Sequence, residues 1–407
     1  MSVLRNRHVA ALIVAEIVSS LGSRITFLAL PWFVLVTTGS ATKMGIVLAV
    51  QLAPIALLGI PSGTAVARLG ARRTMQLADL ARVPLMCSLP LLHAAGLLTF
   101  PLLLGLVFLI GCFVAPFFAS QRVILPELVG EDETTVAQAN AVIEGATTLT
   151  NLLGPLAAGL LIATLGATNA LYVDAGTFLV SFLVLTFFVP ARPPLPQTDD
   201  AHGVLAGLRF LVRDRLLRRI GLAAVFLNLF GSALSAALPV LAYSEFGGSS
   251  RVAGALFAAL GAGAVLGMVL AVRLMPRYKP LRLAAVAIVA LPLPLFLLAL
   301  DLPLWATLLA LFVSTIPQPL VNAPVIGLLT LRTPEALRPK VMTAVLTVAM
   351  LAGPVGLAAA GPLLEVFGTR TVFALVAAGM TTFALYFASV AVRFGPEAAQ
   401  SRPAVAA

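Results

Sequence analysis

Residues 138–159 read QANAVIEGATTLTNLLGPLAAG, a segment that is apolar enough to cross a bilayer yet carries a carboxylate. Its polar side chains recur at i, i+4, i+7 and i+11, so they fall on one stripe of a helix that turns by ~100° per residue. They are Asn140, Glu144, Thr147 and Asn151. A carboxylate within a membrane helix is costly and marks a functional site by default. The segment therefore predicts a membrane helix with a proton-binding or substrate-binding face.

The composition of the whole chain agrees with a membrane protein. The 407 residues are 60% hydrophobic and only 10% charged, with a mean hydropathy of +1.06. Soluble proteins carry about 25% charged residues. The apolar runs have the length of helical spans, about 20 residues, rather than that of barrel strands. We therefore predict an all-α polytopic membrane protein with 12 transmembrane helices. The spans are expected at 9–37, 43–67, 74–96, 98–120, 135–164, 168–190, 218–243, 251–272, 283–300, 303–330, 341–364 and 370–392.

The positive charge of the chain is distributed as a topology signal. The formal net charge is +10, and 21 of the 26 lysines and arginines fall on one side of the predicted spans. Only Lys43, Arg251 and Arg370 fall on the other side, and Arg24 and Arg82 lie within spans. Since lysine and arginine accumulate in cytoplasmic loops, we expect both termini in the cytoplasm. The charge is assigned to topology and not to nucleic-acid binding.

Two blocks of six spans flank a polar segment and predict two pseudo-symmetric six-helix bundles. The expected parts are an N-terminal bundle over 1–190, a cytoplasmic linker over 191–217, a C-terminal bundle over 218–395 and a cytoplasmic tail over 396–407. The pair Gly154-Pro155 is echoed by Gly353-Pro354 in the second block. Repeated halves are typical of alternating-access transporters. Within the linker, GVLAGLRFLVRDRLLRRI is either a short interfacial helix or the start of the next span.

The sequence gives no indication of a catalytic domain. The loops opposite the cytoplasm are a few residues long, and no Gly-rich phosphate-binding loop occurs. Cys87 and Cys112 lie within spans, without the spacing of a disulfide or metal site. We therefore predict that the protein is not an enzyme and holds no metal or cofactor. Transport would draw on an ion gradient, such as the proton motive force.

The loop between the second and third spans carries a family motif. Residues 63–73 read GTAVARLGARR, which resembles the G-x-x-x-D-R-x-G-R-R signature of the major facilitator superfamily. Gly63, Arg68, Gly70 and Arg72 match the signature, whereas Ala67 stands where the signature has an aspartate. The resemblance implies that this loop helps to close the cytoplasmic gate. Asp79 and Glu127 are the candidates to replace the missing acid.

The resemblance to this superfamily covers nearly the whole chain and includes the segment 138–159. GPLAAG at 154–159 resembles the antiporter motif G-P-x-x-G-G through Gly154, Pro155 and Gly159, with Ala158 as a departure. The resemblance narrows to proton-coupled drug exporters, among them macrolide-efflux proteins, enterobactin exporters and Tap-type multidrug pumps. It implies a bacterial inner-membrane protein that works by proton antiport and alternating access.

Ionisable residues within the spans are the candidates for proton coupling. Glu144, Glu16 and Arg24 are predicted to form the proton-coupling or substrate site, and the alternative is a buried ion pair between a carboxylate and Arg24. Glu16 and Arg24 share a helix face but are eight residues apart, ~12 Å along the axis, so they cannot pair directly. Asp79 and Arg82 are spaced i, i+3 and can pair. We interpret them as a structural ion pair within the gating motif.

Polar residues on several spans are predicted to line a substrate cavity. Some recur on one helix face, although such stripes also form hydrogen bonds between helices. The candidates are Asn140, Thr147, Asn151, Ser20, Gln51, Asn228, Ser232, Gln318 and Asn322.

These observations predict a secondary active transporter that exports small amphipathic compounds by proton antiport. A carboxylate that can hold either a proton or a substrate charge couples the two flows. Its partners would be the substrate, protons and the bilayer, and the protein is expected to be a monomer. The alternatives are a dedicated exporter of one metabolite, a lipid flippase of the same fold, and a membrane sensor or scaffold.

The substitution Glu144→Gln tests the assignment of the 138–159 helix. The variant should insert normally but lose proton-coupled efflux, because an amide cannot exchange a proton at this position. The measurement is pH-gradient-driven efflux of a dye from liposomes that contain the purified protein. Retained efflux would remove Glu144 from the coupling site.

Overall fold

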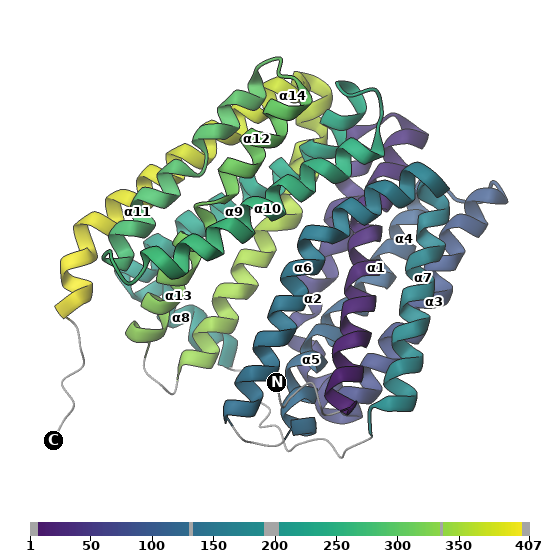
Figure 1. Ribbon diagram of the computed structural model, residues 1–407, viewed down its shortest axis with the longest axis horizontal. Coiled ribbons are helices and arrows are strands. Elements are labelled where there is room, and N and C mark those ends of the chain that lie inside the picture. Colours follow the sequence, from purple (N-terminus) through teal and green to yellow (C-terminus); the bar gives the residue numbers. More distant parts are fainter. Residues whose placement is uncertain (1–6, 130–132, 191–202, 334–336, 401–407) are drawn as a thin grey trace. The chain divides into compact units, whose positions relative to one another are not determined.

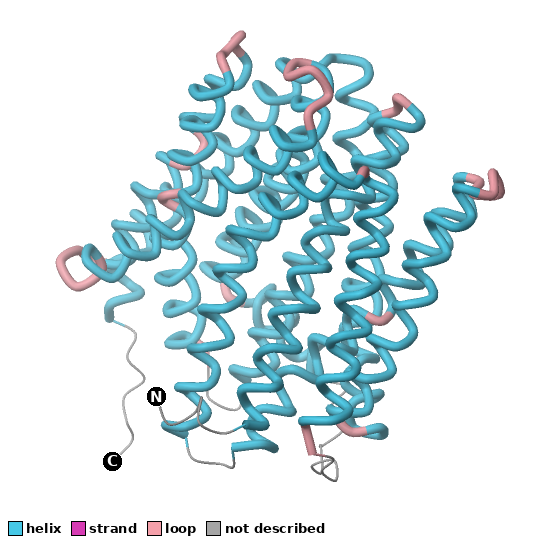
Figure 2. Tube along the Cα trace, turned by 45° about the vertical axis from the view of Figure 1, so that its right-hand side comes forward, coloured by secondary structure: helices cyan, strands magenta, loops and turns pink. Residues whose placement is uncertain are grey.

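The computed structural model of the chain describes residues 7–129, 133–190, 203–333 and 337–400. Helices joined by short turns account for most of these residues (Figure 2), and no strand occurs within these four ranges. In the described chain, 11 segments are long and apolar enough to cross a membrane. The protein is therefore an all-helical, multi-pass membrane protein, as the sequence predicts.

The first of two compact units contains Met1–Asp199 together with Pro239–Ala258. Its complete helices, labelled in Figure 1, are α1 (Arg7–Thr38), α2 (Ala41–Leu69), α3 (Ala71–Ala94), α4 (Phe100–Cys112), α5 (Val114–Val129), α6 (Glu133–Leu165) and α7 (Ala167–Phe188). Helix α7 packs along both α1 and α3, and α1 also packs along α6. Residues far apart in the sequence therefore meet on the facing sides of α1, α3 and α7.

The second unit contains Asp200–Leu238 and Ala259–Ala407. Its helices are α8 (Gly203–Arg213), α9 (Arg215–Ser244), α10 (Ser250–Leu274), α11 (Pro280–Ala290), α12 (Leu304–Thr315), α13 (Gln318–Arg332) and α14 (Arg338–Gln400). The end of α9 and the start of α10 belong to the first unit. Within the second unit, α8 and α11 both pack against α14.

Several expected spans are interrupted at prolines or glycines. The span expected at 98–120 is divided into α4 and α5, and Pro116 at the start of α5 has no N–H to continue the ladder of α4. The span expected at 283–300 changes from α11 into a 3₁₀ helix over Leu293–Ala299, next to Pro292. The span expected at 303–330 is divided at Pro317. Helix α14 contains the last two expected spans, and Gly368 (φ 75°) breaks it between them.

The linker contains a helix of its own. Helix α8 ends at Arg213, and α9 begins at Arg215. The Asp214 carboxylate between them accepts hydrogen bonds from the backbone N–H groups of Leu216 (2.8 Å) and Leu217 (3.0 Å). An aspartate that satisfies the free N–H groups of the first turn starts a new helix. Of the two interpretations of this stretch, the structure therefore favours a separate helix over a simple extension of the next span.

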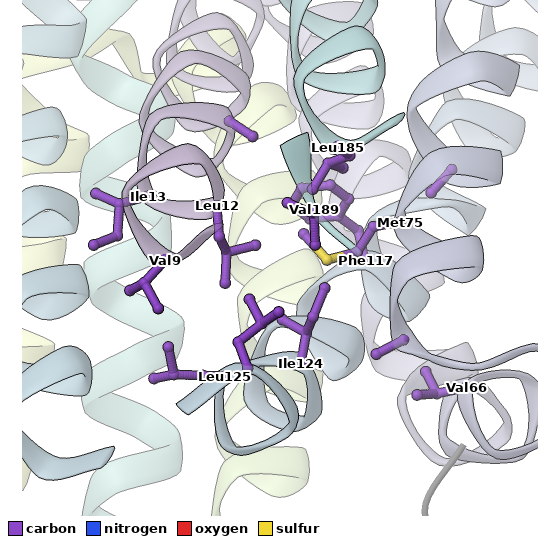
Figure 3. Close-up of a cluster of buried hydrophobic side chains, with 14 residues drawn as sticks. Val9, Leu12, Ile13, Val66, Met75, Phe117, Ile124, Leu125, Leu185 and Val189 are labelled. Atoms are coloured by element: carbon purple, nitrogen blue, oxygen red, sulfur yellow. The ribbon is translucent and has the colours of Figure 1, made fainter. Parts of the chain in front are cut away.

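A core cluster holds one end of the first unit together (Figure 3). It combines apolar side chains from α1, α3, α5 and α7, among them Val9, Leu12, Met75, Phe117, Ile124, Leu125 and Leu185. Beside it, the Arg72 side chain at the start of α3 donates hydrogen bonds to the carbonyl oxygens of Leu185 (3.0 Å) and Thr186 (2.6 Å). These carbonyls lie in the last turn of α7, where a cation is favourable. The gating-motif arginine therefore ties α3 to the end of α7.

Gly22 is a point of close contact between α1 and α7. A Cβ at this position would collide with Asp174 Oδ1 and Thr177 Oγ1 on α7. We expect Gly22→Ala to destabilise the protein by roughly 1–3 kcal/mol, the usual cost of overpacking. The measurement is thermal unfolding in detergent. Gly105→Ala in α4 is the matched control, because nothing lies within 4 Å of its added Cβ. Equal stability of the two variants would contradict the close α1–α7 contact.

Candidate functional site

A buried ion pair lies in the interior of the first unit. On α3, Arg82 Nη2 is 2.5 Å from Asp79 Oδ1, which is the i, i+3 pair that the spacing predicts. The exposed fractions are 2% for Arg82 and 0% for Asp79. Among the described residues, the second carboxylate oxygen of Asp79, Oδ2, is buried and has no hydrogen-bond partner. The pair is thus removed from solvent.

Two aromatic rings hold the Arg82 guanidinium. It lies 4.0 Å from the ring centroid of Phe178 on α7 and 4.9 Å from that of Phe117 on α5. Arg82 Nε also donates to the carbonyl oxygen of Ala78 (3.1 Å). A planar cation stacked on aromatic faces gains cation–π stabilisation that a lysine would not reproduce in this geometry. Three helices therefore fix one charged side chain.

A second buried carboxylate, Asp174 on α7, lies in the same electrostatic environment. Thr26 on α1 donates a hydrogen bond of 2.5 Å to Asp174 Oδ2, and Thr177 donates one of 3.1 Å to Oδ1. Asp174 is 1% exposed, and Arg82 interacts electrostatically with both Asp174 and Asp79. Gly22 allows α1 to approach this carboxylate closely.

The charges of this cluster do not balance when all three groups are ionised. Asp79 and Asp174 together would carry two negative charges, and Arg82 carries one positive charge. A net charge in an apolar interior is expensive unless it is paired or neutralised. A proton on one carboxylate would restore neutrality. The arrangement is therefore chemically capable of holding and releasing one proton.

Glu16 on α1 is a third buried carboxylate, and it faces a cavity between α1 and α6. It is 4% exposed, and its Oε1 atom has no hydrogen-bond partner in the described structure. The cavity has a volume of about 10 Å³ and is lined by Glu16, Ser20, Thr147 and Thr150, with apolar residues around them. This is about the space that one water molecule needs. The predicted site residues Glu16, Ser20 and Thr147 are thus brought together.

The antiporter-like motif on α6 provides close helix contacts. A Cβ on Gly154 would lie 2.7 Å from Cβ of Arg24, so the aliphatic part of that arginine packs directly on α6. A Cβ on Gly159 would lie 2.7 Å from the Ser250 carbonyl oxygen and 3.0 Å from Cα of Gly254 on α10. Pro155 lies inside α6 without ending it. Among the described side chains, Arg24 has no ion-pair partner, and Glu16 does not pair with it.

The gating motif surrounds a helix break. Gly70 (φ 81°) separates α2 from α3 in a conformation that favours glycine, and Arg68 before it is exposed. Arg72 binds the end of α7, as above. The burial and contacts of Gly63, Ala67 and Glu127 are not among those that the structure describes. Asp79 pairs with Arg82 and lies within the interior.

The remaining candidates differ in their surroundings. The side chains of Glu144 and Asn140 are not among those described, and their helix, α6, is present as predicted. Gln51 is half-buried, and its Oε1 atom has no hydrogen-bond partner among the described residues. Ser232 is half-buried and lies beside Gly353 on α14. The other candidates, Asn151, Asn228, Gln318 and Asn322, are exposed.

Sequence reasoning predicted the Asp79–Arg82 pair but did not connect Asp174 with it. Asp79 and Asp174 are 95 positions apart, and only the packing of α3 on α7 brings them together. The threonines and phenylalanines around them are ordinary residues of apolar helices. The signal available in the sequence was the presence of two acids and one arginine within the third and sixth expected spans.

An all-helical membrane fold with buried charges within its spans is typical of transporters. Residues 12–357 and 220–406 match the profile of the Major Facilitator Superfamily. The chain is also 31% identical over 377 residues to the multidrug efflux pump Tap of Mycolicibacterium fortuitum, covering 88% of this chain and 90% of the relative. The chain belongs to the Major Facilitator Superfamily, which confirms the resemblance inferred from the loop motif. Its relatives are transporters and not enzymes.

Further relatives and solved structures agree with this family. The chain is 27% identical over 397 residues to Tap of Mycobacterium tuberculosis (strain ATCC 25618 / H37Rv), covering 91% of both chains. It is 32% identical over 216 residues to the enterobactin exporter EntS of Escherichia coli O1:K1 / APEC, covering 52% of this chain and 50% of the relative. The nucleoside transporter NupG has the same fold, with a TM-score of 0.76, 15% identity, and coverage of 94% of this chain and 98% of NupG.

Arg82 should be essential for stability because it pairs with Asp79 and interacts electrostatically with Asp174, both of which are buried. Arg82→Gln removes that compensation, and we expect a loss of about 3–5 kcal/mol. Arg82→Lys should lose less, since it keeps the charge but not the aromatic stacking. Thermal unfolding of the detergent-purified protein measures both. Arg68→Gln, at an exposed position in the last turn of α2, is the control. The double variant Arg82→Gln/Asp79→Asn should recover part of the loss. If Arg82→Gln were as stable as Arg68→Gln, the cluster would not be a structural centre.

Proposed function

We propose that this protein exports small amphipathic compounds from the bacterial cytoplasm by proton antiport. The observation that carries the proposal is Glu16, a buried carboxylate with an unpartnered oxygen next to a cavity of about 10 Å³. The direction of transport is supported by the relatives, which are named as efflux pumps and as an exporter. The bacterial inner membrane and a monomeric state are part of the proposal.

The coupling follows from competition for a carboxylate. A protonated Glu16 is neutral and stable in an apolar site, whereas an ionised Glu16 requires water or a substrate group as its partner. Proton binding and substrate binding therefore exclude one another. Arg24 lies on the same helix, and its packing against Gly154 keeps a positive charge close to the α1–α6 contact. A neutral or zwitterionic amphipathic compound fits this environment better than a simple cation.

The proton gradient supplies enough energy for useful export. One charge moved across 100 mV is worth ~2.3 kcal/mol, which supports a concentration ratio of roughly fiftyfold. The proposed movement is alternating access by the halves 1–190 and 218–395, connected by the linker 191–217. The Asp79–Arg82–Asp174 cluster offers a second proton-binding group in the same unit.

A dedicated exporter of one metabolite is the second candidate. It is favoured by the similarity to an enterobactin exporter over 52% of this chain. Deleting or overexpressing the gene for this protein in its host, and then measuring resistance to a panel of compounds, distinguishes the two functions. A resistance profile that includes chemically unrelated drugs supports the multidrug pump, and a change for one compound alone supports the dedicated exporter.

Glu16→Gln tests the coupling role. A difference of one pH unit is worth about 1.4 kcal/mol per proton. The wild-type protein in liposomes should therefore establish a ratio of about tenfold, per pH unit, between the substrate concentrations on the two sides of the membrane. We expect the variant to establish no such concentration ratio, although it should still let the substrate move down its own gradient. The glutamine amide has the shape of the glutamate side chain but cannot bind and release a proton. The assay is substrate distribution across liposomes with an imposed pH gradient.

Asp301→Asn serves as the matched control for this assay. Asp301 is 82% exposed at its side chain and pairs with Arg370 at 3.1 Å, outside the buried site. This variant should behave as wild type. A normal pH-dependent ratio in Glu16→Gln would overturn the role of Glu16.

A further inference from the structure

An apolar groove opens beside the linker helix in the second unit. It has a volume of about 460 Å³ and lies between α8, α9, α13 and α14. That volume is within the range of small-molecule sites, about 300–1,000 Å³. Most of its lining is aliphatic, including Leu208, Val212, Ile220, Leu222, Val325 and Val345. The groove therefore suits a hydrocarbon chain.

The floor of the groove is a packed and capped structure. Leu211 on α8 and Leu217 on α9 are buried in a cluster with Leu329, Val341 and Ala344. This cluster anchors α8 on α13 and α14. The Asp214 cap fixes the turn between α8 and α9. The helices that form the groove are therefore held in place by packing and by the Asp214 cap.

The charged part of the lining consists of two arginines. Arg218 and Arg219 line the groove on α9. The hydrogen bond from Arg218 Nη1 to the Val212 carbonyl oxygen is long, at 3.5 Å, and the side chain is exposed. Arg213 and Arg215 are exposed nearby, and the one acid of this stretch, Asp214, is engaged in capping. The opening therefore carries positive charge next to an aliphatic cleft.

We propose that this groove binds an anionic phospholipid of the membrane leaflet that α8 contacts. An acyl chain would occupy the aliphatic cleft, and the phosphate would bind to the exposed Arg218, with Arg219 beside it in the lining. Guanidinium groups bind phosphate oxygens in a bidentate manner, and basic pockets between membrane helices recruit acidic headgroups. The bound lipid connects α8 with α9, α13 and α14. The linker helix is therefore held partly by lipid.

The charge of the lining selects this occupant over others. Among the described lining residues, a cationic drug would meet two arginines and no carboxylate, so the groove disfavours it. A zwitterionic lipid offers the same chains, but its headgroup brings a positive group to the same arginines. On α8, Leu208, Leu211 and Val212 line the groove, while Arg209 and Arg213 are exposed. An acidic lipid satisfies both the apolar and the charged parts.

Native mass spectrometry of the purified full-length protein tests the proposal. The probes are phosphatidylglycerol and phosphatidylcholine with identical acyl chains, added at equal concentration. We expect wild type to retain phosphatidylglycerol about tenfold more than phosphatidylcholine, which corresponds to about 1.4 kcal/mol. Arg218→Gln/Arg219→Gln should abolish that preference. Phosphatidylglycerol should also raise the unfolding temperature of wild type, and this rise should be lost in the variant.

Two further variants separate the groove from general electrostatic attraction. Arg273→Gln/Arg277→Gln removes the same charge from the end of α10 and its following turn, outside the groove, and should keep the preference. Ala224→Trp fills the cleft from α9 and should lower the retention of both lipids, even if the arginine variant does not fold. Equal retention of both lipids by wild type, or equal loss in both arginine variants, would overturn the proposal. Displacement of the lipid by a transported drug would instead assign the groove to substrate access.

Discussion

The interior of the first unit is organised around one buried cation. Arg82 cannot be left alone in an apolar interior, because the cost of an unpaired charge there exceeds that of most packing defects. It therefore requires Asp79 beside it, the rings of Phe117 and Phe178 around it, and Asp174 within its field. Four helices contribute to this environment, since Thr26 on α1 binds Asp174. The requirement to neutralise one charge thus sets how α1, α3, α5 and α7 meet.

Close contacts at glycines make this convergence geometrically feasible. Without a hydrophobic driving force inside a bilayer, helices associate through close packing and polar contacts. Gly22 admits the α7 carboxylate to the surface of α1, and Gly154 admits the stem of Arg24 to the surface of α6. The antiporter-like motif therefore provides close helix packing in this structure, against Arg24 on α1 and Gly254 on α10.

The two units differ in where their charged side chains lie. The first unit encloses three carboxylates, Glu16, Asp79 and Asp174, that are at most 4% exposed. The second unit has no such described cluster of buried acids, and its distinctive feature is the aliphatic groove with Arg218 and Arg219 at the linker. Proton handling is accordingly proposed for the first unit and lipid contact for the second.

The sequence alone determined the membrane class, the helical spans and the family, because hydropathy, charge asymmetry and a loop motif are local properties of the chain. It also predicted the Asp79–Arg82 pair, since residues three apart on a helix are neighbours. It could not place the helix breaks at Phe113, between α4 and α5, and at Pro317, between α12 and α13. The apolar stretch continues across both positions. Only the tertiary structure joined Asp174 to Arg82, and Glu16 to Thr147, because packing between distant helices has no signature in the spacing of residues along the chain.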